Sequence, residues 1–190
     1  GQIAPKNLFD LRPDLRAVKL LASLPEKNAH SLFGGIANEL AKDGITLIEA
    51  TPWLKPAMPE ADFQLGPEPT DDVHADIEYG LRIARETSRL EIGQTVVVKN
   101  GTVLAVEGLE GTDACLTRGG ELAKGAVAVK IPKPGHDLRF DIPCLGAQTL
   151  ETCASVNIRA LAFEANRTLL LDESEVDALA QRHGITLTAV

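Results

Sequence analysis

The sequence has few cysteines, few aromatic residues and no excess of positive charge. Its three cysteines are an odd number without a secretory signal ahead of them, which argues against a disulfide framework and favours a reducing compartment such as the cytoplasm. A net charge of -8, with aromatic residues making up only 4% of the chain, argues against nucleic acid as a partner. No apolar run approaches the ~20 residues that cross a bilayer.

Motifs of several well-known enzyme classes are also absent. The chain has no Gly-x-x-x-x-Gly-Lys-Ser/Thr phosphate loop, no Gly-x-Gly-x-x-Gly turn and no Gly-x-Ser-x-Gly elbow, so kinases, nucleotide oxidoreductases and serine hydrolases find no support. The histidines and cysteines lack the paired spacing of a zinc site, and the cysteines are more simply explained as small apolar side chains. The only methionine is Met58, so we expect the sequence to be a piece of a longer protein.

The first third of the chain predicts two helices and a short strand. Gly44 is a natural stop for the second helix. Breakers and charges crowd residues 51–69, and we place a domain boundary near residue 65. We expect residues 1–65 to be the tail of an N-terminal domain with its linker, and residues 66–190 to form a C-terminal α/β domain of the catalytic type. The elements expected in the first part are helices over 14–24 and 28–43 and a strand over 46–50.

The rest of the chain alternates strands with helices. The pair Asn100-Gly101 joins two β-rich runs and predicts a type I′ hairpin turn. Thr70, Thr112 and Asp172 stand where helices begin, and Asp172 has the spacing of a capping box. The expected helices cover 70–90, 112–122, 147–156 and 173–183, and the expected strands cover 95–99, 102–107, 126–131, 159–164, 168–171 and 185–189. This alternation predicts an α/β fold, a mixed sheet with flanking helices in layers.

Charged residues gather in two loops that each follow a predicted strand, over 107–113 and 130–143. Loops at the ends of strands are where α/β proteins bind ligands. The carboxylates there, which suit Mg²⁺ or Mn²⁺, are Glu107, Glu110, Asp113, Asp137 and Asp141. The cations near them, which suit phosphate oxygens, are Arg118, Lys130, Lys133 and Arg139. Together the two sets predict phosphoryl chemistry.

The same residues also have purely structural interpretations. Asp113 at the start of a helix can serve the helix dipole, and Asp137 with Arg139 can form a solvated ion pair. Lys130 can extend its amine from the end of an apolar strand into solvent. His136 alone does not indicate a metal site. The residue types and their spacing leave these interpretations open beside the phosphoryl site.

A longer pattern runs in order through nearly the whole chain. It includes Glu110-Gly111-Thr112-Asp113, Arg139-Phe140-Asp141-Ile142-Pro143 and the stretches 10–14, 90–94, 103–107, 130–135 and 164–172. In this pattern the sequence resembles the LpxI-type UDP-2,3-diacylglucosamine pyrophosphatases of lipid A biosynthesis. Asn166 stands where we expect the family to have glycine, and a left-handed turn can accept it.

The resemblance implies a hydrolase that converts UDP-2,3-diacylglucosamine to UMP and 2,3-diacylglucosamine 1-phosphate, with attack at the phosphorus nearer the sugar and with Mg²⁺ or Mn²⁺ as cofactor. It assigns the essential carboxylate to Asp141. On this basis the expected catalytic residues are Asp141, Asp113 and Glu110, the expected metal ligands are Asp141 and Asp113, and the expected phosphate-binding residues are Thr112, Lys130, Lys133 and Arg139.

The resemblance also implies where the protein works. It points to a cytoplasmic protein in peripheral contact with the inner face of the inner membrane, and to a homodimer. Family members begin with a glycine-rich strand and turn that this sequence lacks, so we expect the metal site to be kept and acyl-chain binding to be lost. Two other classes stay open: a non-catalytic module that binds nucleotide sugars or anions on the same fold, and a structural or oligomerisation domain.

Overall fold

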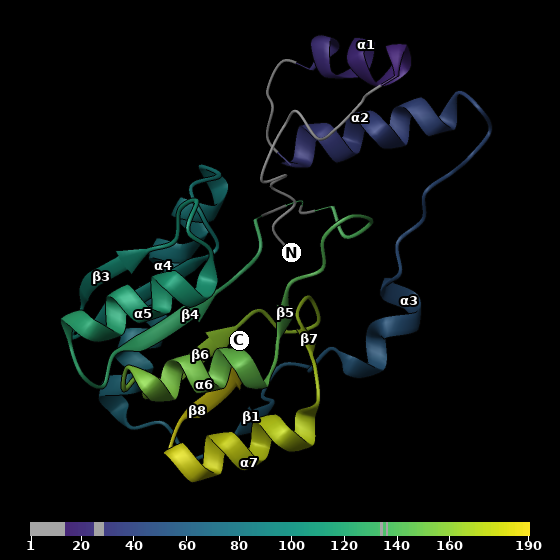
Figure 1. Cartoon of the computed structure of the whole chain (residues 1–190). Helices are drawn as coiled ribbons and strands as arrows, with labels where there is room; N and C mark the ends of the chain where they lie inside the picture. Colours follow the sequence, from purple (N-terminus) through teal and green to yellow (C-terminus); the bar gives the residue numbers. More distant parts are fainter. Residues whose placement is uncertain (1–13, 25–28, 134, 136) are drawn as a thin grey trace. The chain divides into compact units, whose positions relative to one another are not determined.

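A computed structural model describes residues 14–24, 29–133, 135 and 137–190 (Figure 1). The chain divides into two compact units, one of residues 1–52 with 137–141 and the other of residues 53–136 with 142–190. The boundary expected near residue 65 stays a prediction. The expected helix start at residue 28, the stretch 10–13 and His136 lie outside the described residues. Among the described helices, none combines the length and the apolar character that a bilayer crossing requires.

The first unit contains the two helices that the sequence predicted, α1 (Leu15–Ser23) and α2 (Ala29–Ala41). The Asp14 carboxylate accepts a hydrogen bond of 2.7 Å from the backbone N–H of Ala17 and so caps α1. Arg16 on α1 donates to the Glu39 carboxylate of α2 at 2.7 Å and to Asp43 at 2.6 Å, which fastens one helix to the other.

The strand expected over residues 46–50 is wrong, because these residues have no regular secondary structure. A strand is stable only when a neighbour pairs with its backbone, and the described part of the first unit contains no other strand. A short helix α3 (Thr51–Leu54) and a 3₁₀ turn η2 (Lys55–Ala57) follow instead.

The second unit is built on a mixed sheet of six strands in the order β1-β8-β6-β4-β2-β3. β4, β6 and β8 are parallel, β2 is antiparallel to both β4 and β3, and β1 is antiparallel to β8. The carboxyl ends of β3, β4, β6 and β8 therefore meet at one edge, which we call the carboxyl edge. The strands are β1 (Gln64–Leu65), β2 (Thr95–Lys99), β3 (Thr102–Val106), β4 (Val127–Lys130), β6 (Ala160–Phe163) and β8 (Thr186–Ala189).

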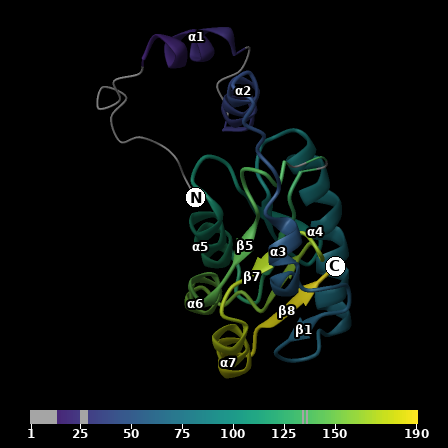
Figure 2. The same ribbon diagram turned by 90° about the vertical axis from the view of Figure 1, so that its right-hand side faces the viewer.

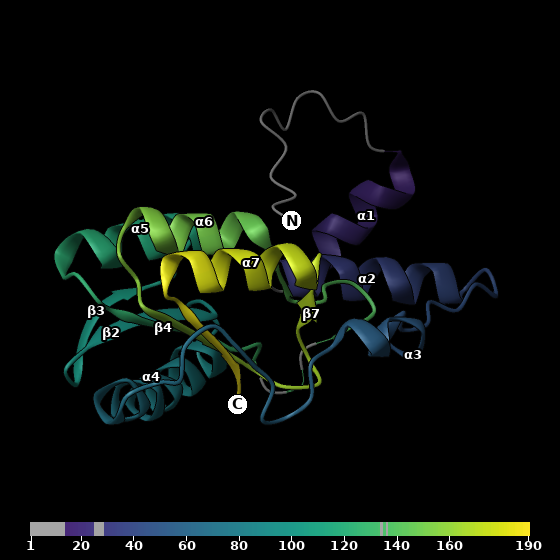
Figure 3. The same ribbon diagram turned by 90° about the horizontal axis from the view of Figure 1, so that it is seen from below.

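Helices cover both faces of this sheet, which confirms the layered α/β fold. Figures 2 and 3 show α4 on one side of the strands and α5, α6 and α7 on the other. Alternating strand residues build the two cores: Val96 and Val98 pack with α4, and Val97 packs with α5. The helices are α4 (Asp71–Arg89), α5 (Thr112–Leu122), α6 (Ala147–Ser155) and α7 (Glu173–His183), all close to their predicted ranges.

None of the three helix caps predicted at Thr70, Thr112 and Asp172 makes a side-chain capping bond. Asp172 precedes α7, but it has the left-handed conformation with a φ of 51° and makes no side-chain capping bond, so no capping box forms. Thr112 is the first residue of α5, and Gly111 with a φ of 86° occupies the cap position. Thr70 does precede α4, but its hydroxyl donates to the Asp72 carboxylate instead of capping the backbone.

The hairpin turn was predicted correctly from the sequence. A small second sheet was predicted only in part, because one of its two strands was missed. Asn100 and Gly101 have φ values of 49° and 68°, the left-handed pair of a type I′ turn, which confirms the hairpin. Asn166 is also left-handed with a φ of 59°. β7 (Leu169–Leu170), which was predicted, pairs in parallel with β5 (Cys144–Leu145), which was not.

Candidate active site

Three polar residues lie side by side at the carboxyl edge of the sheet. Thr95 begins β2 and pairs with Lys130 at the end of β4, and the Glu107 backbone N–H, just after β3, donates to the Thr95 carbonyl at 2.8 Å. Strand alternation directs the side chains of all three toward the face that α5 covers, because their neighbours Val96, Val106 and Val129 pack on the opposite face. The sheet thus fixes a row of one carboxylate, one hydroxyl and one amine.

The loop between β3 and α5 brings the first residue of α5, Thr112, next to Thr95 and Glu107. Its last residue, Gly111, precedes α5 without a side-chain cap, and the first bond inside the helix is that from the Cys115 N–H to the Gly111 carbonyl. The backbone N–H groups of the first turn therefore have no partner within the helix. Thr112, which we expected to bind phosphate, and Asp113, which we expected to bind metal, both lie in this turn. Free N–H groups at a helix start favour an anion.

Glu110 is paired with a cation of its own chain. Its carboxylate accepts from Arg118 at 2.6 Å and from the Gly108 N–H at 3.0 Å, and the pKa of Glu110 is lowered mainly by the hydrogen bond from Arg118. Arg118 also donates to the Val106 carbonyl at 2.8 Å. Through these contacts Glu110 and Arg118 hold the loop between β3 and α5 in place. The spacing of the residues did not indicate this role.

Asp113 contacts the next helix. Its carboxylate accepts a hydrogen bond of 3.1 Å from the Gln148 side chain on α6. This contact orients one carboxylate oxygen of Asp113 at the start of α5. No local pattern indicates Gln148 as the partner, because a residue 35 positions away is brought close only by the packing of α5 on α6.

The two lysines of the second loop differ in their surroundings. Lys133 forms an ion pair of 2.6 Å with Glu91, a residue of the turn after α4 with a φ of 58°. Lys130 makes only a long contact of 3.5 Å with the Cys144 carbonyl within the described part of the chain. Lys130 is therefore the cation of this edge that is more available to a phosphate group.

Arg139 and Asp141 belong to the first compact unit, whereas the other predicted site residues belong to the second. Arg139 donates to both oxygens of the Asp137 carboxylate at 2.9 Å and 2.7 Å, and this bond raises the pKa of Arg139. The ring of Phe140 stacks on that of Phe33 from α2, with centroids 5.6 Å apart, and the Arg139 guanidinium lies over the Phe140 ring. Asp141, which follows, is exposed. The ion pair that the structural interpretation expected is present.

The second unit has one feature that suits a divalent cation. The Oε2 atom of Glu107 is buried and has no hydrogen-bond partner, while its Oε1 atom accepts from the Thr112 hydroxyl at 3.3 Å. Within the described ranges, no three histidine, cysteine or acidic side chains gather as a metal cluster. One free carboxylate oxygen beside a hydroxyl fits Mg²⁺, which binds one or two carboxylates and completes its shell with phosphates and water.

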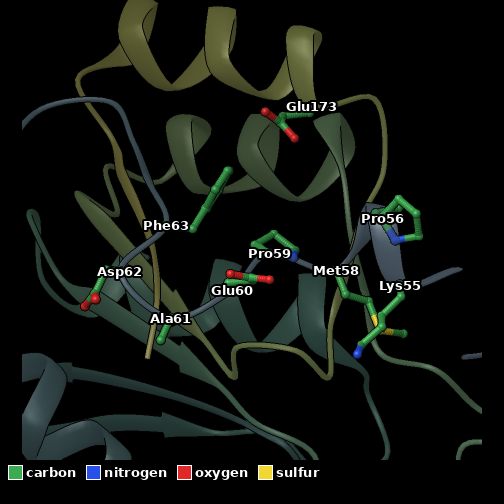
Figure 4. Close-up of a pocket in the computed structure, with 10 residues that line it drawn as sticks. Lys55, Pro56, Met58, Pro59, Glu60, Ala61, Asp62, Phe63 and Glu173 are labelled. Atoms are coloured by element: carbon green, nitrogen blue, oxygen red, sulfur yellow. The ribbon is translucent and has the colours of Figure 1, made fainter. Parts of the chain in front are cut away.

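A pocket of about 500 Å³ lies elsewhere in the second unit (Figure 4). It is lined by residues 55–63 and by Glu173 at the start of α7. None of the residues predicted for the site lines this pocket, and we assign it no function.

Cys115 and Cys153 are buried in the core, and burial raises the pKa of each thiol to about 12, so both behave as apolar side chains at neutral pH.

The second unit is a layered α/β fold with acidic, basic and hydroxyl side chains at the carboxyl ends of its strands, the place where α/β proteins bind ligands. Residues 61–188 match the family model of the LpxI C-terminal domain, and residues 1–57 match that of the LpxI N-terminal domain. The chain is 34% identical over 203 residues to the UDP-2,3-diacylglucosamine pyrophosphatase LpxI of Caulobacter vibrioides, with 100% of this chain and 72% of that relative covered. The chain belongs to the LpxI family.

Proposed function

We propose that the chain hydrolyses UDP-2,3-diacylglucosamine to UMP and 2,3-diacylglucosamine 1-phosphate. The observation that carries this proposal is the 34% identity along the whole chain to a relative named for that substrate. In the reaction, the oxygen of water bonds to one phosphorus while the bridging P–O bond breaks. Attack at the phosphorus nearer the sugar makes UMP the leaving group, as the family resemblance implies.

The carboxyl edge of the second unit supplies groups for the pyrophosphate. Lys130 offers a positive charge, and the first turn of α5, which begins at Thr112, offers backbone N–H donors. Positive groups that are already in place offset the charge that develops on the phosphoryl oxygens. We also propose that Lys133 and Arg139 bind phosphate oxygens of the substrate. To do so, Lys133 leaves its ion pair with Glu91, and Arg139 leaves its ion pair with Asp137.

The carboxylates are proposed to act on the attacking water. By resemblance to the family, Asp113 and Asp141 are the candidates for orienting the water and accepting its proton, with Asp141 the essential one. Glu110 holds the loop through Arg118 and so keeps the start of α5 in place.

We also propose that the protein is in peripheral contact with the inner face of the inner membrane, where the lipid substrate lies, and that it forms a homodimer.

Mg²⁺ or Mn²⁺ is the proposed cofactor. Asp113 and Asp141 are the ligands that the family pattern suggests, and the free Oε2 atom of Glu107 supports a cation at the carboxyl edge. When bound, the ion supplies positive charge that stabilises the transition state and lowers the pKa of bound water.

The proposal is tested by measuring UMP release from UDP-2,3-diacylglucosamine in the presence of Mg²⁺, with UDP-N-acetylglucosamine as the non-lipid comparison. We expect release from the lipid substrate, loss of release with EDTA, and recovery when Mg²⁺ is added back. Binding of the substrate without release of UMP would instead identify a non-catalytic nucleotide-sugar module. If neither Mg²⁺ nor a uridine ligand changes the melting temperature, a structural domain is indicated.

A further inference from the structure

The free carboxylate oxygen of Glu107 requires a partner that the described chain does not provide. A buried polar atom without a hydrogen bond costs about 1–3 kcal/mol, and a charged one costs more. Folded proteins have few such atoms, and each calls for an explanation. Of the buried side-chain atoms without partners in the described residues, Oε2 of Glu107 is the only carboxylate oxygen.

The position of Glu107 is closely constrained by its neighbours. A side chain at Gly93 would place its Cβ 2.0 Å from the Glu107 carbonyl oxygen and 2.9 Å from the Glu107 Cβ, so only glycine allows this approach. The Glu107 N–H donates to the Thr95 carbonyl at 2.8 Å, and Oε1 accepts a long hydrogen bond of 3.3 Å from the Thr112 hydroxyl. A residue whose backbone is fixed in this way is suited to present its remaining oxygen to a ligand.

The surroundings of this oxygen favour a cation. The Thr112 hydroxyl donates to Oε1, and within the described residues no lysine or arginine forms an ion pair with Glu107. Mg²⁺ is satisfied by one or two protein carboxylates because substrate phosphates and water complete its octahedral shell. The α5 N-terminus and Lys130 on the same face of the sheet suit those phosphates.

We infer that Glu107 is a protein ligand of the divalent cation and binds it through Oε2. This inference rests on the proposed function for the use of the ion, but it concerns a residue outside the pair Asp113 and Asp141. Thr112 then has two roles, because its hydroxyl donates to Oε1 while its backbone lies in the first turn of α5 that we propose receives phosphate.

The test measures binding of Mn²⁺ by electron paramagnetic resonance, with Mn²⁺ alone and with Mn²⁺ plus UDP, in the wild-type chain and in the variant Glu107→Gln. Glutamine has the same shape and its carbonyl oxygen still accepts from Thr112, so a purely structural role would be preserved. We expect Mn²⁺ binding to weaken at least about 10-fold in Glu107→Gln, with no fall in the melting temperature without metal. The matched control is Glu121→Gln, an exposed carboxylate of the same helix as Thr112.

Mn²⁺ binding by Glu107→Gln within about twofold of the wild type would overturn the inference, as would the absence of saturable Mn²⁺ binding by the wild type in both conditions. A variant Glu107→Asp, which keeps the charge, should recover part of the affinity. Because this readout does not use turnover, failure of UMP release by the wild type would reject the proposed function without deciding the role of Glu107.

Discussion

At the scale of single residues, one buried carboxylate holds the best-predicted turn of the fold. Asp76 on α4 is only 2% exposed, and its two oxygens accept from the backbone N–H groups of Asn100 and Gly101 at 2.9 Å each. The turn sequence specifies the backbone conformation of the hairpin, while Asp76 fixes the hairpin against α4. No local pattern indicates this contact, because the partners are 24 and 25 residues apart.

Replacing Asp76 by alanine leaves two backbone N–H groups without their partner. We expect Asp76→Ala to lower the free energy of unfolding by about 2–4 kcal/mol, as measured by urea denaturation. Glu78→Ala, on the exposed side of the same helix, should change it by less than about 0.5 kcal/mol. Equal effects of the two substitutions would show that the Asp76 contacts do not stabilise the hairpin.

The ionisation of Asp72 should make the stability of the fold depend on pH. The Thr70 hydroxyl and then Arg159 lower the pKa of Asp72 from its ordinary value of 3.8 to about 2. A pKa that is lower in the folded state means that the charged form stabilises the fold above about pH 4, and that this contribution is lost as the pH falls toward 2.

The wild type and Asp72→Asn should therefore differ in melting temperature at pH 6, with the wild type higher, and the difference should shrink between pH 4 and pH 2. A difference that stays constant over this range would contradict the assigned pKa. Asp71→Asn serves as the control for the helix dipole, because Asp71 lies in the same first turn of α4.

At the scale of elements, two helices approach the sheet through glycines on opposite faces. A Cβ at Gly80 of α4 would lie 2.6 Å from Val129, and one at Gly119 of α5 would lie 2.6 Å from Val97. Both valines are fully buried β-branched residues, so they have little freedom to move aside. The glycines therefore set how closely α4 and α5 pack on the sheet.

A methyl group at Gly119 would push α5 away from β2. We expect Gly119→Ala to destabilise the fold by about 1–3 kcal/mol despite the higher helix propensity of alanine. The measurement is chemical denaturation, with Glu121→Ala on the exposed side of α5 as the control. If Gly119→Ala unfolded at a higher denaturant concentration than the wild type, helix propensity would outweigh packing at this position.

The elements also show which structural features a sequence pattern can predict. Apart from α3, the helices follow from local signals, as does the Asn100-Gly101 hairpin, namely apolar periodicity and turn residues. The strand expected at 46–50 failed because pairing is decided by distant residues, and β5 was missed because a two-residue strand has no pattern of its own. The cap expected at Asp172 failed because Asp172 has a left-handed backbone, whereas a capping residue normally has an extended one.

At the scale of the whole molecule, the predicted site residues lie in both compact units. Glu110, Thr112, Asp113, Lys130 and Lys133 belong to the second unit, and Arg139 and Asp141 belong to the first. The sequence located the loops that carry them, because strand ends in α/β proteins are predictable. It did not give their partners, such as Glu91 for Lys133 and Gln148 for Asp113, because these contacts depend on tertiary packing.

We propose that this chain is a pyrophosphatase whose activity depends on Asp141. The measurement that tests this is the rate of Mg²⁺-dependent UMP release from UDP-2,3-diacylglucosamine by the wild type, by Asp141→Ala and by Glu151→Ala, an exposed carboxylate on α6. We expect release by the wild type and Glu151→Ala and a loss of at least about 100-fold in Asp141→Ala. Unchanged release by Asp141→Ala, or no release by the wild type where the Caulobacter relative is active, would contradict it.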